Sequence, residues 1–461
     1  MATPNTKLAG WFELSGLSQK ELARQVIRRA HARGERHVCT DASRVHHWFA
    51  GQQPRHPVPA ILSEIFTERF GHPVTIEDLG LQHEKSAIFH QVDLPWDLAA
   101  TVNGIDQFTR SDLMLNRRDM VVETSAVVAG SALIGPLQGW LTSVPSIATA
   151  KNEGRRIGMG DVEEIEQTLA IFHRLDFQHG GGKIRKAVVA YLNEVNNLVR
   201  GASCTEKVRR RALSALSDLA GGLAGWMSFD IGLHATAQRY FILGVHAAQE
   251  AGDQILAADT LACMARQMRH LARPKDALDL LQLAEYGSRN QATPTLRAML
   301  QVEQAQTLAH VKRIQDCHRA GAIAQQVFTS SPAANDPAWL GYFDEAELLA
   351  VTGAAYRDLA WYDPSYAEQA ASLLAQAVDG FDPNHIRSRA LALADQASAH
   401  ALQGDYAHAH TITDQALLIA SRLNSTRVND RFKALRGYLA GQKHREVHEL
   451  RDKLTTALVP A

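Results

Sequence analysis

The sequence is poor in cysteine and has none of the spacings that build a metal site. Four cysteines are scattered over 461 residues without a C-x-x-C pair: Cys39, Cys204, Cys263 and Cys317. This usage is typical of a reducing compartment and argues against a zinc site. The adjacent His46 and His47 would point about 100° apart on a helix and could not chelate one ion alone. We therefore expect a cytoplasmic protein without a metal or other cofactor.

The signatures of common enzymes are also missing. The sequence contains no H-E-x-x-H, no G-x-S-x-G and no paired-carboxylate constellation. The run 180–183, Gly-Gly-Gly-Lys, lacks the spacing of a phosphate-binding loop, and Ile184 stands where serine or threonine is required. We interpret it as a turn between helices, capped or braced by Asp176, and we expect no enzymatic activity.

The chain also has little that suggests export or membrane insertion. Its N-terminus lacks a basic-then-apolar signal segment. Arg117 and Arg118 open a mostly apolar run to Leu141 that superficially resembles a twin-arginine signal, but a whole domain precedes it. Glu123 and Pro136 argue against a membrane span. A packed linker is the preferred interpretation, ahead of membrane contact and export.

Strand patterns are absent, and helical patterns fill most of the chain. Alternating β-branched runs between Asn-Gly or Asp-Gly turns do not occur. A content of 46% hydrophobic and 21% charged residues is that of a packed globular protein. We predict an all-α fold with a helix-turn-helix domain over 1–83, a linker with one or two helices over 84–160, and a tetratricopeptide-like helical solenoid over 161–461.

The first domain is expected to hold four helices. Ser18 and Asp41 precede apolar-periodic segments and are typical N-caps, with Glu21 at the capping-box position. Pro57 starts the fourth helix. The side chains expected to face the core are Leu8, Trp11, Phe12, Leu14, Leu22, Ala23, Val26, Val45, Trp48, Phe49, Ile61, Leu62, Ile65 and Phe66.

Segments 17–26 and 40–55 together are typical of a DNA-reading helix pair, the second of them rich in hydrogen-bonding side chains. Arg44 is the best candidate for a base contact, because a guanidinium bonds guanine bidentately. The N-terminus of the first helix of this pair favours a DNA phosphate, because its backbone N–H groups and the helix dipole attract an anion. Residues 1–60 contain nine lysines and arginines against four acidic residues, +5 on a chain of −1. The DNA-binding candidates are Ser18, Gln19, Lys20, Thr40, Ser43, Arg44, His46, His47, Gln52 and Arg55.

Helix-breaking points recur through the last 300 residues. They lie near Gly232, Arg273, Arg313, Asp363 and Gly404, at spacings of 41, 40, 50 and 41 residues. A period near 40 in an all-helical region indicates stacked helix pairs. The clearest unit is 391–420, in which 404–406 makes the turn and small residues such as Ala409 and Ala416 pack against the first helix.

Several segments resemble a Streptomyces family of transcriptional regulators that join a helix-turn-helix to tetratricopeptide-like repeats and restrain differentiation. The resemblance lies in residues 40–45, 48, 54–71, 111–115, 117–118, 223–230 and 237–241. It implies a cytoplasmic repressor of sporulation and antibiotic production, but no known operator or ligand. Members of this family carry arginines where this chain has His46 and His47. Since imidazoles are charged only under mildly acidic conditions, we expect stronger DNA binding at pH 6 than at pH 8.

Two functions remain in competition at this stage. The first is a DNA-binding regulator, expected to be a homodimer on double-stranded DNA, whose repeat groove takes a peptide, small molecule or protein. We consider Asn193, Asn196 and Asn197 as candidates for hydrogen bonds to a peptide backbone, on composition alone. The alternative is an interaction scaffold that does not read DNA, because the outer face of the second helix offers a single arginine.

Overall fold

The chain forms two compact units, Met1–Gln91 and Val92–Ala461, which are described separately. The computed structural model describes residues 4–32, 38–54, 57–70, 74, 78–81, 93–114, 127–146, 156–329, 336–442 and 444–458. These residues are helical apart from turns, loops and one isolated β-bridge between Arg156 and Ser203. The predicted all-α class is therefore confirmed. No helix among the described residues combines the length and the apolar character needed to cross a bilayer.

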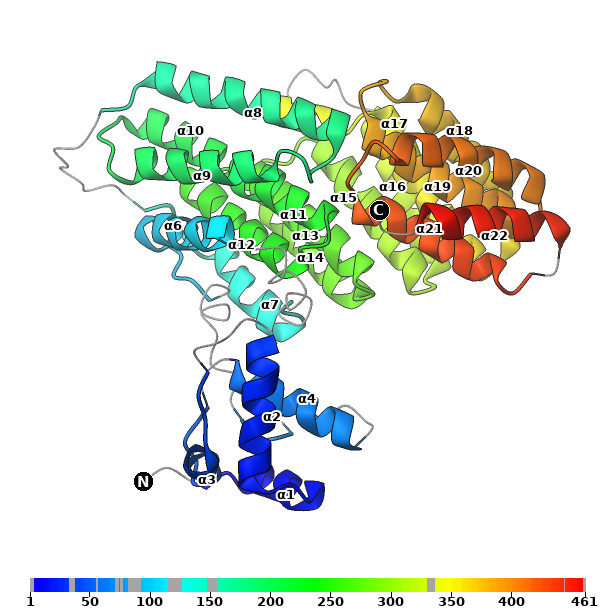
Figure 1. Ribbon diagram of the computed structural model, residues 1–461. Helices are drawn as coiled ribbons and strands as arrows, with labels where there is room; N and C mark the ends of the chain where they lie inside the picture. The colour runs from blue at the N-terminus through cyan, green and yellow to red at the C-terminus, as the bar shows by residue number, and fades with distance from the viewer. Residues whose placement is uncertain are drawn as a thin grey trace. The chain divides into compact units, whose positions relative to one another are not determined.

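The N-terminal unit contains four described helices around one core. They are α1 (Thr6–Ser15), α2 (Gln19–Ala32), α3 (Ala42–Phe49) and α4 (Val58–Phe70). The helix α2 packs against both α3 and α4 (Figure 1). All the side chains predicted for this core are buried or half-buried except Leu14, which is 75% exposed. That assignment was wrong because α1 ends one residue later, and Leu14 lies on its outer side.

Local capping explains where these helices begin. The Ser18 hydroxyl accepts a hydrogen bond from the Glu21 amide at 3.2 Å, and an Asp41 carboxylate oxygen accepts one from the Arg44 amide at 2.8 Å. Both caps satisfy backbone donors that have no partner within the helix. Both caps agree with the sequence prediction.

The second unit begins with helices that pack along its later helical stack. The first is α6 (Leu98–Met114), whose buried Asp112 accepts hydrogen bonds from Arg185 at 2.5 Å and from the Tyr240 hydroxyl at 2.6 Å. Next come α7 (Ser131–Leu137) and the 3-10 helix η2 (Gln138–Leu141). Ahead of α7, the side-chain amide of Gln238 accepts a hydrogen bond from the Val128 N–H and donates one to the Val128 carbonyl, each at 2.8 Å. The described parts of 93–146 are thus held against the stack.

Three long helices and an irregular run follow. They are α8 (Met159–His179), α9 (Arg185–Arg200), α10 (Glu206–Ser217), the π-helix η3 (Asp218–Gly225) and α11 (Trp226–Asp230). The turn at 180–184 separates α8 from α9, as predicted. The π-helix packs closely on α12 (His234–Ala251), because a Cβ on Gly244 would lie 2.9 Å from the Gly221 nitrogen. A π-helix is rare and often marks a functional region.

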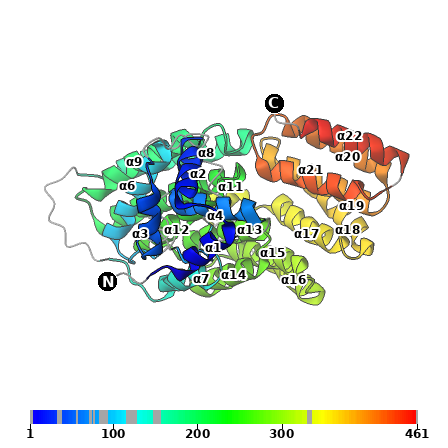
Figure 2. The same cartoon turned by 60° about the horizontal axis from the view of Figure 1, so that its bottom comes forward.

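Five helix hairpins complete the second unit. Their helices are α13 (Gln254–His270) with α14 (Pro274–Ser288), α15 (Pro294–His310) with α16 (Ile314–Thr329), α17 (Glu345–Ala360) with α18 (Ala367–Gly380), α19 (Ile386–Leu402) with α20 (Tyr406–Ala420), and α21 (Thr426–Leu439) with α22 (Arg445–Ala457). The first helix of each hairpin contacts the first helix of the next. Both views show α17 to α22, yellow to red, continuing the stack beyond α15 and α16 (Figures 1 and 2).

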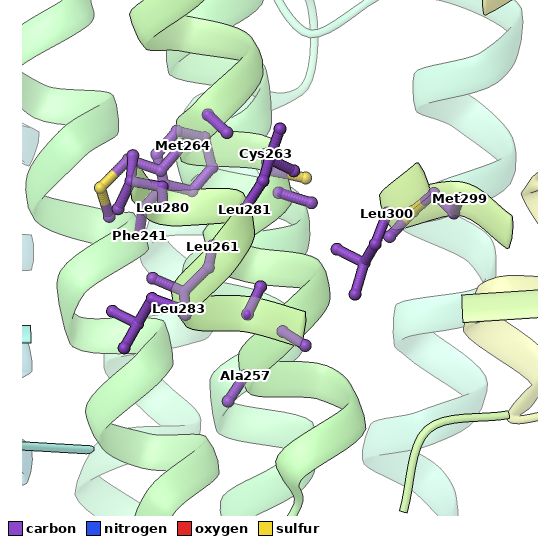
Figure 3. Packing of buried hydrophobic residues seen from close by; sticks show 14 of the residues in the cluster. Phe241, Ala257, Leu261, Cys263, Met264, Leu280, Leu281, Leu283, Met299 and Leu300 are labelled. Carbon is purple, nitrogen blue, oxygen red and sulfur yellow. The ribbon is translucent and has the colours of Figure 1, made fainter. Parts of the chain in front are cut away.

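The predicted breaking points coincide with turns. At four of them, a residue with a left-handed backbone conformation (positive φ) closes the turn, and these residues are Gly232, Ala272, Lys312 and Gly404. The fifth point, at 361–363, precedes the short 3-10 helix η6 (Pro364–Tyr366). Ala409 and Ala416 are fully buried against α19, as expected. The largest apolar core lies among α12 to α15, where Phe241, Leu261, Met264 and Leu280 gather (Figure 3).

Candidate functional site

The N-terminal unit presents a polar face on α3. Val45 and Trp48 point into the core, whereas Ser43, Arg44, His46 and His47 are exposed. One guanidinium N–H of Arg44 donates to the Cys39 carbonyl at 2.7 Å, which ties the side chain to the segment leading into the helix. A guanidinium has five donors, so four remain for another partner.

The other predicted DNA-binding residues are placed less uniformly. Ser18 and Lys20 are exposed, Gln19 is half-buried, and Gln52 is exposed just after α3. Thr40 is half-buried, and its hydroxyl oxygen is buried without a hydrogen-bond partner, which makes it the weakest of these candidates. Arg55 lies outside the described residues. Figure 1 shows α3 at the end of the unit where α2 begins.

Between α2 and α3, the structure describes only residues 38–41, which lead directly into the Asp41 cap. The described part of α2 ends at Ala32, and α3 begins at Ala42. Support for DNA reading therefore comes from the polar outer face of α3 and not from the turn between the two helices.

The second unit encloses a charged cavity. Its volume is about 130 Å³, and its lining comes from α8, η3, α11, the first helices of all five hairpins and the 3-10 helix η5 (Ala338–Tyr342). A recess of about 820 Å³ shares part of this lining, including His173, Phe177, Trp339 and Tyr342. The interior of the helical stack is therefore polar and partly open.

Contacts between distant parts of the second unit lie in the wall of this cavity and next to it. Arg387 at the start of α19 donates two hydrogen bonds to Asp176 of α8, at 2.9 and 2.8 Å. Ser425, just before α21, donates to an Asp230 carboxylate oxygen at 2.7 Å. Asp176 was expected to cap or brace the glycine turn, and its backbone carbonyl accepts a hydrogen bond from the Gly180 N–H at 2.8 Å. Its carboxylate has a further role that the sequence did not indicate, because it joins α8 to Arg387, 211 residues later.

Most charges in the cavity wall are paired. Glu303 accepts hydrogen bonds from Arg266 at 2.6 Å and Arg269 at 2.7 Å, and these two cations lower the pKa of Glu303 although burial alone would raise it. His173 lies 3.0 Å from Asp218. Burial lowers the pKa of His173, but its charge interaction and hydrogen bond with Asp218 dominate and raise it above the ordinary value.

Burial raises the pKa of two carboxyl groups in the wall. One is Asp259, which accepts a hydrogen bond from the Tyr342 hydroxyl at 2.7 Å. The other is Glu347. In both, burial disfavours the charged form.

Trp226 of α11 lies among three arginines. The guanidinium carbons of Arg427, Arg387 and Arg266 are 4.6, 5.4 and 5.7 Å from its ring centroid, within the range of cation–π attraction. They come from α21, α19 and α13, so tertiary packing alone assembles the cluster. We call Trp226 with these three arginines the arginine cluster.

The asparagines suggested for a peptide site do not line this cavity. Asn196 is buried and donates to the Val102 carbonyl at 2.8 Å, and Asn193 accepts from the Thr109 hydroxyl at 3.0 Å. Asn197 is exposed. The first two hold α6 against α9, so the suggestion from composition was wrong. Composition cannot distinguish an amide that braces a helix from one that lines a groove.

The sequence patterns did not predict the cavity, although one irregularity in the repeat spacing indicated it. The spacing of breaking points rises to 50 residues between Arg313 and Asp363, where the others are about 40. The extra length contains η5, which brings Trp339 and Tyr342 into the cavity wall. An irregular repeat length was therefore a usable indication.

Comparisons with known proteins bear on the N-terminal unit alone. Residues 8–82 match a family model described as the SP15 N-terminal domain. Curated proteins and solved structures gave no match to the chain. Within the described residues, no group of three or more histidine, cysteine or acidic side chains is arranged to hold a metal ion. The chain is thus similar to the SP15 N-terminal domain over its first unit.

Proposed function

We propose that the protein is a DNA-binding transcriptional regulator that reads DNA with α3. The observation that carries this proposal is the division of α3 into a buried side, with Val45 and Trp48, and an exposed side, with Ser43, Arg44, His46 and His47. A short rigid helix with exposed donors near its start suits the major groove. The charge of +5 over residues 1–60 supplies the attraction to phosphates.

The start of α2 supports a second contact. Ser18, Gln19 and Lys20 lie at a helix N-terminus, where backbone N–H groups and the helix dipole favour a phosphate oxygen. In this arrangement Lys20 binds the backbone and adds affinity without sequence preference. Arg44 then contributes base recognition through its free guanidinium donors.

The proposed regulator is a repressor of differentiation and antibiotic production that acts in the cytoplasm as a homodimer. The resemblance of residues 40–45, 48 and 54–71 to the Streptomyces regulators supports this assignment. We further propose that the second unit is a tetratricopeptide-like repeat domain that receives a signal. Its five hairpins, with first helices in mutual contact, support that assignment.

A scaffold that does not read DNA is the second candidate. One observation favours it, which is the single arginine on the outer face of α3. In that case the exposed face of α3 would be an ordinary solvated surface.

Chromatin immunoprecipitation of the tagged full-length chain distinguishes the two. We expect discrete genomic peaks for the native chain and their loss for Arg44→Ala. Arg422→Ala, which removes an exposed arginine from the second unit, is the matched control and should retain the peaks. Circular dichroism must show that Arg44→Ala is folded, because the substitution also removes the bond to Cys39.

Two results would contradict DNA reading. One is the absence of peaks for folded native protein, and the other is an Arg44→Ala pattern identical to the native one. If peaks are found, binding to the recovered sequence should weaken steeply with salt, because phosphate contacts release counterions.

A further inference from the structure

The arginine cluster contains cationic donors that the protein does not satisfy. The Arg266 side chain is 7% exposed and bonds Glu303 through Nε, yet its Nη2 has no hydrogen-bond partner. The Nη1 of Arg427 also lacks one, and its nearest carboxylate oxygen, on Asp230, is 3.9 Å away. An unmet buried donor on a charged group costs stability, and such groups are frequent at sites that receive a ligand.

The cations around Arg427 outnumber the carboxylates available to it. Asp176 is engaged by both terminal nitrogens of Arg387, and Asp230 already accepts a hydrogen bond from Ser425. Burial lowers the pKa of Arg427 to about 10, and the neighbouring arginines act in the same direction while Asp230 opposes them. The position therefore has a local excess of positive charge that an anion would relieve.

The space beside the cluster suits a small molecule. Arg427 is 16% exposed and lines the cavity of about 130 Å³ together with Arg266. That volume approaches the roughly 150 Å³ that accommodates a benzene-sized molecule. A cavity of this volume is too small for a folded protein as the occupant.

The adjoining recess has a different character. It shares Phe177, Trp339 and Tyr342 with the cavity and contains apolar side chains from α8 and α13. Its volume of about 820 Å³ is within the range of sites that take small organic ligands. Aromatic side chains near two arginines with unpaired donors match a ligand with an apolar body and one negatively charged end.

We propose that this cavity binds a small amphipathic anion, with its carboxylate or phosphate group at Arg427 and Arg266 and its apolar or aromatic body beside Trp339 and Tyr342. Guanidinium groups bond both kinds of oxyanion strongly. The proposal names the class of signal for the second unit, and so it rests on the proposed sensing role. Binding is measured without DNA, so a failure of DNA binding and a failure of this proposal remain distinguishable.

Titration calorimetry of the full-length chain tests the proposal with benzoate and phenyl phosphate as probes. We expect saturable one-site binding of at least one probe, and the preferred head group identifies the source as carboxylate or phosphate. The neutral analogue benzyl alcohol should bind at least tenfold more weakly. Chloride is adjusted to hold ionic strength constant, because general screening affects every surface charge.

Two matched arginine variants locate the head group. Arg427→Met keeps the aliphatic stem and removes the guanidinium, and should weaken binding at least tenfold. Arg422→Gln removes an exposed charge five residues earlier and should change affinity less than twofold. In the absence of probe, Arg427→Met should not lower the thermal midpoint, because it removes a buried cation with an unmet donor.

Several outcomes would overturn the proposal. These are no saturable binding of either anion, unchanged affinity in Arg427→Met, or equal weakening by Arg422→Gln. If Arg427→Met fails to fold, Trp339→Leu decides instead, since it shortens the aromatic wall without touching the arginine cluster. Weaker binding in Trp339→Leu of each probe that binds the native chain supports the placement, and unchanged affinity contradicts it.

Discussion

The two units use their arginines in opposite ways. Arg44 of the N-terminal unit lies on the surface of α3 and is tied only to the Cys39 carbonyl. Arg387 of the second unit is buried and shares two hydrogen bonds with Asp176. A surface charge costs little and stays available to a partner, whereas a buried charge depends on its counterion. Removing the first should therefore change binding, and removing the partner of the second should change stability.

The largest expected effect comes from the buried pair. Asp176→Asn leaves the Arg387 guanidinium without its main counterion and should destabilise the second unit by about 3 kcal/mol. Urea unfolding of the full-length chain, followed by circular dichroism, measures the loss in the major transition.

The control for this change is an exposed pair in the same unit. Arg210 lies 2.7 Å from Glu206, with both side chains about half exposed. Arg210→Ala should cost about 0.5 kcal/mol or less. A loss below 1 kcal/mol for Asp176→Asn would contradict the role of this pair in holding α8 against α19.

Acid should weaken the second unit through its buried histidines. Burial lowers the pKa of His246 to about 4, and its ring stacks on Trp96 at 3.8 Å between centroids. The folded state holds this imidazole neutral while the unfolded state takes up a proton below pH ~6.5, so its stabilisation is complete above that pH. The stabilisation decreases as the pH falls from 6.5 to 4, by about 2 kcal/mol at pH 5.

Urea unfolding at pH 7.5 and pH 5 measures this difference, and His246→Gln should reduce it. Burial first and His270 second also lower the pKa of the buried His234 to about 4. His234 therefore acts in the same direction, and part of the pH dependence of stability will remain in His246→Gln. Equal pH dependence in the native chain and His246→Gln would show that His246 is not the titrating group.

The smallest effect is expected at the cap of α3. Asp41→Ala removes the acceptor of the Arg44 amide and should cost about 1 kcal/mol of local stability. Amide hydrogen exchange should then be roughly fivefold faster in the first turn of α3, since 1.4 kcal/mol corresponds to about tenfold. Ser43→Ala, next to it and exposed, is the control. Equal exchange in both variants would argue that the cap does not set the order of α3.

Sequence patterns were reliable where a short stretch decides the outcome. Ser18 and Asp41 cap helices, Val45 and Trp48 are buried, and Gly404 closes a turn, because each follows from neighbours within a few residues. The patterns misplaced Leu14 and the asparagines of α9, whose surroundings depend on helix ends and on α6. They did not indicate the arginine cluster, since its members carry no shared spacing.

The sequence by itself determined that this chain is helical, where its helices turn and which face of α3 is polar. Those properties arise from hydrogen bonding and apolar periodicity over a few turns of chain. Only the tertiary structure decided which charges meet. The Asp176–Arg387 pair spans 211 residues, and Trp226 collects arginines from α13, α19 and α21. A cavity assembled from five hairpins exists only after they stack, because no single hairpin contains enough of its wall to reveal it.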